Sequence, residues 1–367
     1  MDNNYPRLLN ALQEQMRQEE RDGYSFIVKP IPDSQAEGEL DPRVYKVNLE
    51  TMAKFKEMGD APFAVDDTDA LVQAMRQFFG WQNDDVTGGI ILTEHRTVEG
   101  SEAQIPVRIY RPPVEGVRSA VVFFHGGGFA AGSVDVVENP CKCLAMHADA
   151  VVISVDYRLA PEHPYPAGVT DCYDVVRWAA EHAEELGIAP GQLAVAGDSA
   201  GGNLAAVCAL MDRDAGSGMI AFQALLYPSV NMGLLPVEDM SWSLDAYDIR
   251  NHEEMIRGMV QGMRSEGDNP LLKLYLQGRA EPSDPYVAPL LGELQGLPET
   301  LIITAQYDFL KVENEAYARK LARSGVPTTL IQYNGTDHAF MDKSGLYPQA
   351  EDCMLEIAKR FRASLGT

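Results

Sequence analysis

Residues 193–210 read LAVAGDSAGGNLAAVCAL, which is the most informative stretch of the chain. It begins with a short apolar run, typical of strands that are buried on both faces of a parallel sheet. Its end, NLAAVCAL, is compatible with a helix. The intervening GDSAGG needs its glycines, because side chains there would collide with the neighbouring strand and helix. The pattern therefore predicts a sharp turn that lifts Ser199 clear of the sheet, beside the N-terminus of a helix.

Similar apolar runs lie on both sides of this stretch. SAVVFF (119–124) and AVVISV (150–155) come before it, and LIITAQ (301–306) and TTLIQY (328–333) come after it. Further upstream, IILTEHRTV (90–98) and IPVRIYRP (105–112) alternate apolar and polar residues, as half-buried strands do. Helical stretches separate the apolar runs. We therefore expect an α/β fold with a mostly parallel eight-stranded sheet and helices on both of its faces.

A second motif, His125-Gly126-Gly127-Gly128-Phe129, directly follows the apolar run that ends at residue 124. Consecutive glycines let backbone N–H groups point into a site without obstruction by side chains. Acyl transfer builds up a tetrahedral oxyanion, and such donors stabilise it. The alternative is a loop that needs glycine only for its positive φ angles, and the presence of Ser199 downstream favours the functional interpretation.

Two ionisable side chains follow strands in the second half of the chain. Asp308 comes just after LIITAQ, and His338 comes just after TTLIQY. Sites in α/β sheets form at the carboxyl ends of parallel strands. The order Ser199, Asp308, His338 is the chain order of nucleophile, acid and base in the triads of this type of sheet. A neutral imidazole takes the serine proton and returns it to the leaving group, while the carboxylate fixes the tautomer of the ring.

Five stretches carry a family resemblance. They are HGGGF (125–129), YRLAPEHPYPA (157–167), GDSAGGNLA (197–205), YDFLKVENEAYARKL (307–321) and GTDHAF (335–340). Together they resemble the hormone-sensitive-lipase-like family of esterases, over roughly residues 105–367. The resemblance implies an α/β-hydrolase fold with a mobile cap, and Gly127, Gly128 and Ala200 as donors of the oxyanion-hole N–H groups. We also expect the substrate-binding residues to include Phe129, Asp198, Trp242 and Phe340.

The chain departs from the family pattern in two loops. The acid loop usually reads Asp-Pro-Leu-x-Asp-Glu, whereas Phe309 stands here for the proline and Val312 for the second aspartate. The family histidine usually stands between an apolar residue and a glycine, whereas Asp337 and Ala339 flank His338 here. A neighbouring carboxylate favours the charged imidazole, so we expect a pH optimum shifted upward.

Some polar residues near these motifs have competing interpretations. Glu313 and Asp337 are rivals of Asp308 as the acid, although Asp337 adjoins the histidine and is poorly placed to bond its ring. Arg158 and Glu162, in YRLAPEHP, are expected to form a structural hydrogen-bonded pair behind the site.

The alternation of strands and helices is interrupted once. Residues 231–282 follow the strand AFQALLYP (221–228) with helix-like, Met-rich sequence and no further strand. Near the start of the chain, Leu8 and Leu12 recur at helical spacing. We therefore expect three parts. They are an N-terminal helical cap region at 1–82, a catalytic α/β-hydrolase domain at 83–230 and 283–367, and a cap insertion at 231–282.

The composition limits the partners and the compartment. The 367 residues carry a formal net charge of −24, which argues against nucleic acid or an anionic membrane as a partner. Five sparse cysteines, no signal peptide and no long apolar run indicate a cytoplasmic protein without a membrane span. We expect a small-molecule ester as substrate and neither cofactor nor metal, because Cys141, Cys143 and His147 fit helix packing better than a metal site. Monomer and homodimer both stay open.

The sequence leaves three functions to be compared. The first is a serine carboxylic-ester hydrolase for short to medium acyl chains that works through an acyl-enzyme intermediate. The second is a non-catalytic small-molecule receptor on the same fold, as in the plant gibberellin receptors, which lack the catalytic histidine; His338 argues against it. The third uses the same triad on a lactone, an amide or a carbamate, and the motifs do not separate these bonds.

Overall fold

A computed structural model describes residues 4–58, 68–238, 240–262 and 269–366. Within them, ten strands form one sheet in the order β1-β2-β10-β9-β8-β7-β5-β6-β4-β3. The strands are β1 (Arg17–Arg21), β2 (Tyr24–Lys29), β3 (Leu92–Glu99), β4 (Gln104–Arg111), β5 (Arg118–Phe124), β6 (Val151–Val155), β7 (Ile188–Asp198), β8 (Ile220–Leu226), β9 (Glu299–Tyr307) and β10 (Thr328–Asp337). All neighbours from β2 to β6 in this order are parallel, and β1, β4 and β3 run antiparallel to their neighbours.

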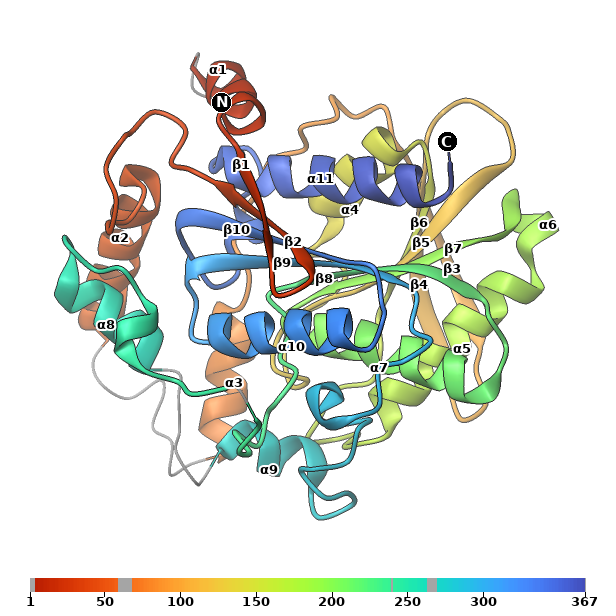
Figure 1. Cartoon of the computed structure of the whole chain (residues 1–367). Coiled ribbons are helices and arrows are strands. Elements are labelled where there is room, and N and C mark those ends of the chain that lie inside the picture. The colour runs from red at the N-terminus through yellow and green to blue at the C-terminus, as the bar shows by residue number, and fades with distance from the viewer. Residues whose placement is uncertain (1–3, 59–67, 239, 263–268, 367) are drawn as a thin grey trace.

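Helices cover both faces of the sheet (Figure 1). The α-helices are α1 (Tyr5–Glu14), α2 (Pro42–Met58), α3 (Thr68–Phe78), α4 (Glu138–Ala148), α5 (Ala167–Glu181), α6 (Ala183–Leu186), α7 (Ala200–Ala215), α8 (Glu253–Gly262), α9 (Pro270–Leu276), α10 (Lys311–Arg323) and α11 (Pro348–Ser364). The described residues also form three short 3₁₀ helices, η1 (Leu244–Ala246), η2 (Pro289–Leu291) and η3 (Phe340–Lys343). Helices α4 and α11 lie on one face, and α5, α7 and α10 lie on the other.

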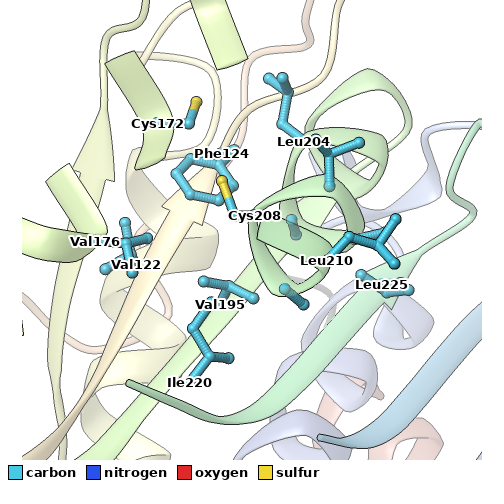
Figure 2. Packing of buried hydrophobic residues seen from close by; sticks show 14 of the residues in the cluster. Val122, Phe124, Cys172, Val176, Val195, Leu204, Cys208, Leu210, Ile220 and Leu225 are labelled. Carbon is cyan, nitrogen blue, oxygen red and sulfur yellow. The ribbon is translucent and has the colours of Figure 1, made fainter. Parts of the chain in front are cut away.

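The core is divided in two by the sheet, because successive residues of a strand point to opposite faces. In β5, Val122 and Phe124 join the apolar cluster under α5 and α7, whereas Val121 and Phe123 join the cluster under α4 and α11. Figure 2 shows the first cluster, in which Cys208 of α7 packs among these strand side chains. A sheet buried on both faces accounts for the continuous apolar runs in the sequence, and it fixes the strand ends that carry the site.

The N-terminal region contains a hairpin where we expected helix. The expected eight strands correspond to β3–β10, and β1 and β2 extend the sheet beyond β10. Asp22 and Gly23 form the hairpin loop, both with positive φ, a two-residue loop that matches the twist of an antiparallel pair. This Asp-Gly loop is the local signal that the helical interpretation of residues 1–82 overlooked.

Strand β2 is tied to the end of the chain through a buried charge. Lys29 Nζ lies 2.7 Å from Glu356 Oε1 and 3.0 Å from Asp352 Oδ2, and all three side chains are fully buried. The hydroxyl of Tyr333, on β10, donates to Asp352 Oδ2 over 2.6 Å. Because unpaired charges are costly inside a protein, this cluster makes β2 an integral part of the sheet.

The described residues of 231–282 contain helices and a single isolated bridge, but no strand of the sheet, as the sequence predicts. None of the described helices is long and apolar enough to cross a membrane.

Candidate active site

Ser199 stands at the apex of the turn between β7 and α7. Its backbone is in an unusual conformation, with φ of 55° and ψ of −115°. The surrounding glycines allow the helix to approach the sheet closely, because a Cβ on Gly201 would lie 2.0 Å from the carbonyl oxygen of Phe124. The Ser199 N–H is held by the carbonyl of Leu226 on β8 over 2.9 Å. A strained residue fixed in this way presents its side chain in one direction.

The positions of His338 and Asp308 follow from the pairing of β10 with β9. The two strands lose their register after Tyr333 and pair again where Asp337 lies opposite Tyr307. The next residue of each strand is therefore His338 on β10 and Asp308 on β9, side by side at the carboxyl end of the sheet. Asp308 Oδ1 also accepts the N–H of Leu310 over 2.8 Å, which holds the carboxylate.

Hydrogen bonds join the three predicted triad residues. His338 Nδ1 donates to Asp308 Oδ2 over 2.8 Å, and Ser199 Oγ donates to His338 Nε2 over 2.9 Å. Asp308 is fully buried, whereas the His338 side chain keeps 22% of its surface exposed. This arrangement fixes the ring tautomer and leaves Nε2 to accept the serine proton.

The two rival acids make other contacts. Glu313 Oε1 accepts the backbone N–H groups of Val230 and Asn231, over 2.7 and 3.2 Å. Asp337 Oδ2 accepts the side-chain amide of Asn48, on α2, over 2.8 Å. Among the three carboxylates, Asp308 is thus the one that accepts a hydrogen bond from the His338 ring.

Several carboxyl groups lie close enough to the imidazole to influence its pKa. Burial disfavours its charged form, but Asp308, through its charge and hydrogen bond, together with the charges of Asp198 and Asp337, raises the pKa of His338 above its ordinary value. Burial, with a contribution from the charge of Asp342, also raises the pKa of Asp198 to about 8. A raised pKa of His338 would act in the direction of the upward shift in pH optimum, which stays a prediction.

The loop His125–Phe129 lies beside the serine and needs its glycines. Gly127 has a φ of +125°, and a Cβ there would lie 2.0 Å from the carbonyl oxygen of Ala131. The N–H of Gly126 donates to Asp198 Oδ1 over 2.9 Å, which joins this loop to the turn that carries the serine. Gly127, Gly128 and Ala200 line the same cavity as Ser199.

His125 supports this loop from below and does not enter the site. It is fully buried, its Nδ1 donates to the carbonyl of Gly126 over 2.7 Å, and its ring stacks on Tyr157 with centroids 4.3 Å apart. Burial lowers the pKa of His125 to about 4, so the ring is neutral. The hydroxyl of Tyr157 donates to the His125 carbonyl over 2.6 Å.

A cavity of about 280 Å³ opens above the serine. Its apolar lining comes from three regions: Met75, Phe78 and Phe79 in and just after α3; Met232, Leu234 and Leu271 in the insertion; and Phe309 and Leu310 after β9. Ser199 and His338 belong to the same lining. The cavity therefore pairs an acyl-transfer arrangement with an apolar compartment of limited size.

Two of the four expected substrate-binding residues, Phe129 and Asp198, line the cavity. The other two, Trp242 and Phe340, are not part of the lining. Phe340 is fully buried against Tyr227 and Tyr333, because Ala339 takes a left-handed conformation that turns the chain back into the core. The indole N–H of Trp242 donates to the Tyr247 hydroxyl over 3.3 Å.

Two aromatic residues near the acid loop were not predicted. The ring of Phe309 lies 4.8 Å from the His338 ring, centroid to centroid. The hydroxyl of Tyr247 donates to the backbone carbonyl of Asp308 over 2.9 Å. The loop that lacks the family proline is thus held by packing and by a contact from the insertion. In the sequence, the departure from the family pattern at position 309 was the signal that could have drawn attention to Phe309.

The expected pair between Arg158 and Glu162 is wrong. Arg158 instead pairs with Asp171, with Nη2 and Oδ1 2.8 Å apart, and with Glu102. Glu162 forms a two-pronged pair with Arg76 of α3, over 2.7 Å at each prong. Arg76 Nε also donates to the carbonyl of Ala130 over 2.8 Å, so it fastens α3 to the end of the glycine loop.

The cysteines considered as metal ligands lie in the core. All five cysteines are buried and free. Over the part of the chain that the structure describes, no group of three or more His, Cys, Asp or Glu side chains is arranged to hold a metal ion.

Taken together, the parallel sheet, the turn that carries the serine and the hydrogen-bonded Ser-His-Asp arrangement define the class of α/β hydrolases. A family model described as the alpha/beta hydrolase fold matches residues 121–342, and the chain belongs to this family. The chain is also similar to carboxylesterase NlhH of Mycobacterium tuberculosis, at 38% identity over 265 residues, which are 71% of this chain and 78% of that protein. An arylesterase of Saccharolobus solfataricus is 35% identical over 250 residues, which are 68% of this chain and 77% of the arylesterase.

Among solved structures, a hyperthermophilic esterase from Pyrobaculum calidifontis matches with a TM-score of 0.68 at 33% identity. The match covers 90% of this chain and all of the esterase. A second structure, described as an arylesterase, matches with a TM-score of 0.71 at 29% identity, covering 89% of this chain and 99% of the other. The resemblance to the hormone-sensitive-lipase-like family, and the α/β-hydrolase fold that it implies, are confirmed.

Proposed function

We propose that this protein is a carboxylesterase that hydrolyses esters of short to medium acyl chains through an acyl-enzyme on Ser199. The observation that carries the proposal is the pair of hydrogen bonds that joins Ser199 to His338 and His338 to Asp308, at the floor of an apolar cavity. Relatives named carboxylesterase and esterase support the reaction class.

In the first half of the reaction, Ser199 Oγ attacks the ester carbonyl carbon while His338 Nε2 takes the serine proton. The C–O bond to the alcohol then breaks, and the imidazolium gives its proton to the departing alcohol oxygen. In the second half, His338 takes a proton from water as that water attacks the carbonyl carbon of the acyl-enzyme. The bond from this carbon to Ser199 Oγ then breaks, the imidazolium returns the proton to Ser199 Oγ, and the carboxylic acid leaves. The carboxylate of Asp308 stabilises the imidazolium formed in each half.

The negative charge on the tetrahedral oxygen needs donors that are already in position. The N–H groups of Gly127, Gly128 and Ala200 are our candidates, because these residues line the cavity beside Ser199. Glycine at 127 is required by its conformation, and Ala200 begins α7, where the helix N-terminus also favours negative charge.

The cavity supports a limit on chain length. Its volume of about 280 Å³ lies at the small end of the range for ligand pockets, and its walls are mainly aliphatic and aromatic. We assign the N-terminal region and the insertion 231–282 to a cap, since both contribute to these walls.

A panel of p-nitrophenyl esters from acetate to palmitate tests the proposal, with lactones and anilides as comparison substrates. We expect kcat/KM to rise from acetate to a maximum between butyrate and octanoate, because each buried methylene contributes about 0.8 kcal/mol until the cavity is full.

The nucleophile is tested by substitution. Ser199→Ala should abolish both turnover and labelling by a fluorophosphonate, apart from residual catalysis by the remaining site. Turnover of every ester equal to that of the unsubstituted protein would overturn the assignment. Preferential hydrolysis of the lactones or anilides would keep the triad and replace the substrate class.

A further inference from the structure

The loop that carries His338 is in contact with the N-terminal region. The carbonyl of Gly335 accepts the backbone N–H of Asp41, just before α2, over 2.9 Å. On its other side, the N–H of Gly335 donates to Gln306 Oε1 over 2.8 Å. A Cβ on Gly335 would lie 2.6 Å from the Asp41 nitrogen, so the two segments are in close backbone contact.

A second contact reaches the residue next to the base. Asn48, one and a half turns into α2, donates through Nδ2 to Asp337 Oδ2 over 2.8 Å and to the Val44 carbonyl over 3.0 Å. A carboxylate and a carbonyl both need a donor, and the two protons of one amide nitrogen supply them. This pairing therefore fixes the orientation of the Asn48 amide and, with it, that of the Asp337 carboxylate.

We propose that Asn48 is a positioning residue for the catalytic base, which holds the Asp337 carboxylate beside His338 and so connects helix α2 to proton transfer at the site. The inference rests on the proposed function, because it concerns the base of that reaction. Asp337 stands where the family motif has an apolar residue, so the connection depends on residues particular to this chain.

The charges around Asp337 and His338 determine whether the loss of Asn48 raises or lowers the pKa of His338. Asn48 of α2 donates a hydrogen bond to Asp337, and Lys343 of η3, Tyr347 and His338 interact with that carboxyl group electrostatically. His338 is hydrogen-bonded to Ser199 and Asp308, and it interacts electrostatically with Asp198, Asp342 and Asp337. Burial raises the pKa of Asp337, and the charge of Lys343 and the hydrogen bond from Asn48 oppose that rise. Removing the Asn48 amide therefore favours protonated Asp337. The negative charge next to His338 is then smaller, which lowers the pKa of the ring.

The test is the acid limb of kcat/KM against pH, measured with p-nitrophenyl butyrate. Hydrolysis needs neutral His338, so a less basic ring moves this limb to lower pH. We expect Asn48→Leu and Asp337→Asn each to move it to lower pH, while kcat on the plateau falls by less than about tenfold. In the Asp337→Asn background, Asn48→Leu should move the limb no further.

One control variant separates this role from a general effect on α2. Met52→Ala, on the same helix with an exposed side chain, should leave the limb in place. An unchanged limb in both Asn48→Leu and Asp337→Asn would overturn the proposal. The proposal would also be overturned if Asn48→Leu moved the acid limb equally in the unsubstituted protein and in the Asp337→Asn variant.

A titration that needs no substrate keeps this test independent of the proposed activity. The imidazole signal of His338, assigned by its loss in His338→Ala, can be followed by NMR against pH in the same variants. A protein that hydrolyses none of the esters would contradict the proposed function, and this titration would still show whether Asn48 acts on His338. Signals typical of a folded chain in each variant exclude misfolding as the cause.

Discussion

The chemical groups and the walls around them belong to two differently built regions. Ser199, Asp308, His338 and the glycine loop follow strands β7, β9, β10 and β5. At Gly127 and Gly201, one added methyl group would collide with backbone. The walls come largely from α3 and the insertion 231–282, which are held by side-chain contacts such as that of Arg76 with Ala130. Backbone contacts leave the first region little conformational freedom, whereas the second region can change shape at a lower cost in free energy. Substitutions in the first should lower kcat strongly, and substitutions in the second should change selectivity.

The largest effect is expected at the acid. Asp308→Asn keeps the size of the side chain but favours the wrong ring tautomer, and kcat should fall by about 10⁴-fold if the triad acts as in serine proteases. The measurement is kcat for p-nitrophenyl butyrate. Glu313→Gln is the matched comparison, because Glu313 bonds backbone N–H groups and not the histidine. A greater loss for Glu313→Gln than for Asp308→Asn would reassign the acid.

A smaller loss is expected in the glycine loop. The added methyl group of Gly127→Ala would meet the Ala131 carbonyl and must displace the loop, so kcat should fall by about 10²–10³-fold, as for a lost oxyanion donor. Gly258→Ala is the control, because the same methyl group on α8 meets no atom within 4 Å. Equal activity of the two variants would exclude a role for this loop in catalysis.

The smallest effect is expected for the cavity wall, where a substitution should change the preferred length of the acyl chain. Leu271, in α9, lies over the glycine loop, with Cδ1 3.2 Å from where a Cβ of Gly128 would stand. Leu271→Ala should lengthen the preferred acyl chain, with a gain of about fourfold in kcat/KM for each further methylene that becomes buried. The ester panel measures this, with Leu49→Ala, on the exposed side of α2, as control. An unchanged profile would show that α9 does not limit the chain.

The sequence predicts the first region well and the second poorly, for a physical reason. Apolar runs buried on both faces identify the central strands, and a site residue that follows such a run must lie at the sheet edge where the other strand ends meet. The positions of Asp308 and His338 needed only this rule. By contrast, the partner of Glu162 is Arg76, 86 residues away, and no local pattern connects them.

The hairpin at residues 17–29 shows a second limit. All five residues of β1, RQEER, are exposed and none is apolar, so the segment has no alternation of apolar and polar residues to identify it as a strand. Charged residues on such a strand protect the sheet edge from pairing with other chains. From the sequence alone, Lys29 at the end of β2 would be expected on the surface. Its buried partners, Asp352 and Glu356, lie near the other end of the chain, so no local pattern indicates the pairing.

That separation has a consequence for synthesis. Lys29 and Glu356 are 327 residues apart in the sequence, and ribosomes add about 5–20 residues per second. The edge of β2 that pairs with β10 must therefore wait roughly fifteen seconds to a minute for its partner strand to be translated. During this interval β1 can cover one side of β2, but the other side stays open to chaperones or to neighbouring nascent chains. Helix α11, which is translated after β10, is thus the element that neutralises the buried charge of Lys29, so the sheet is completed only after both of these late segments have been made.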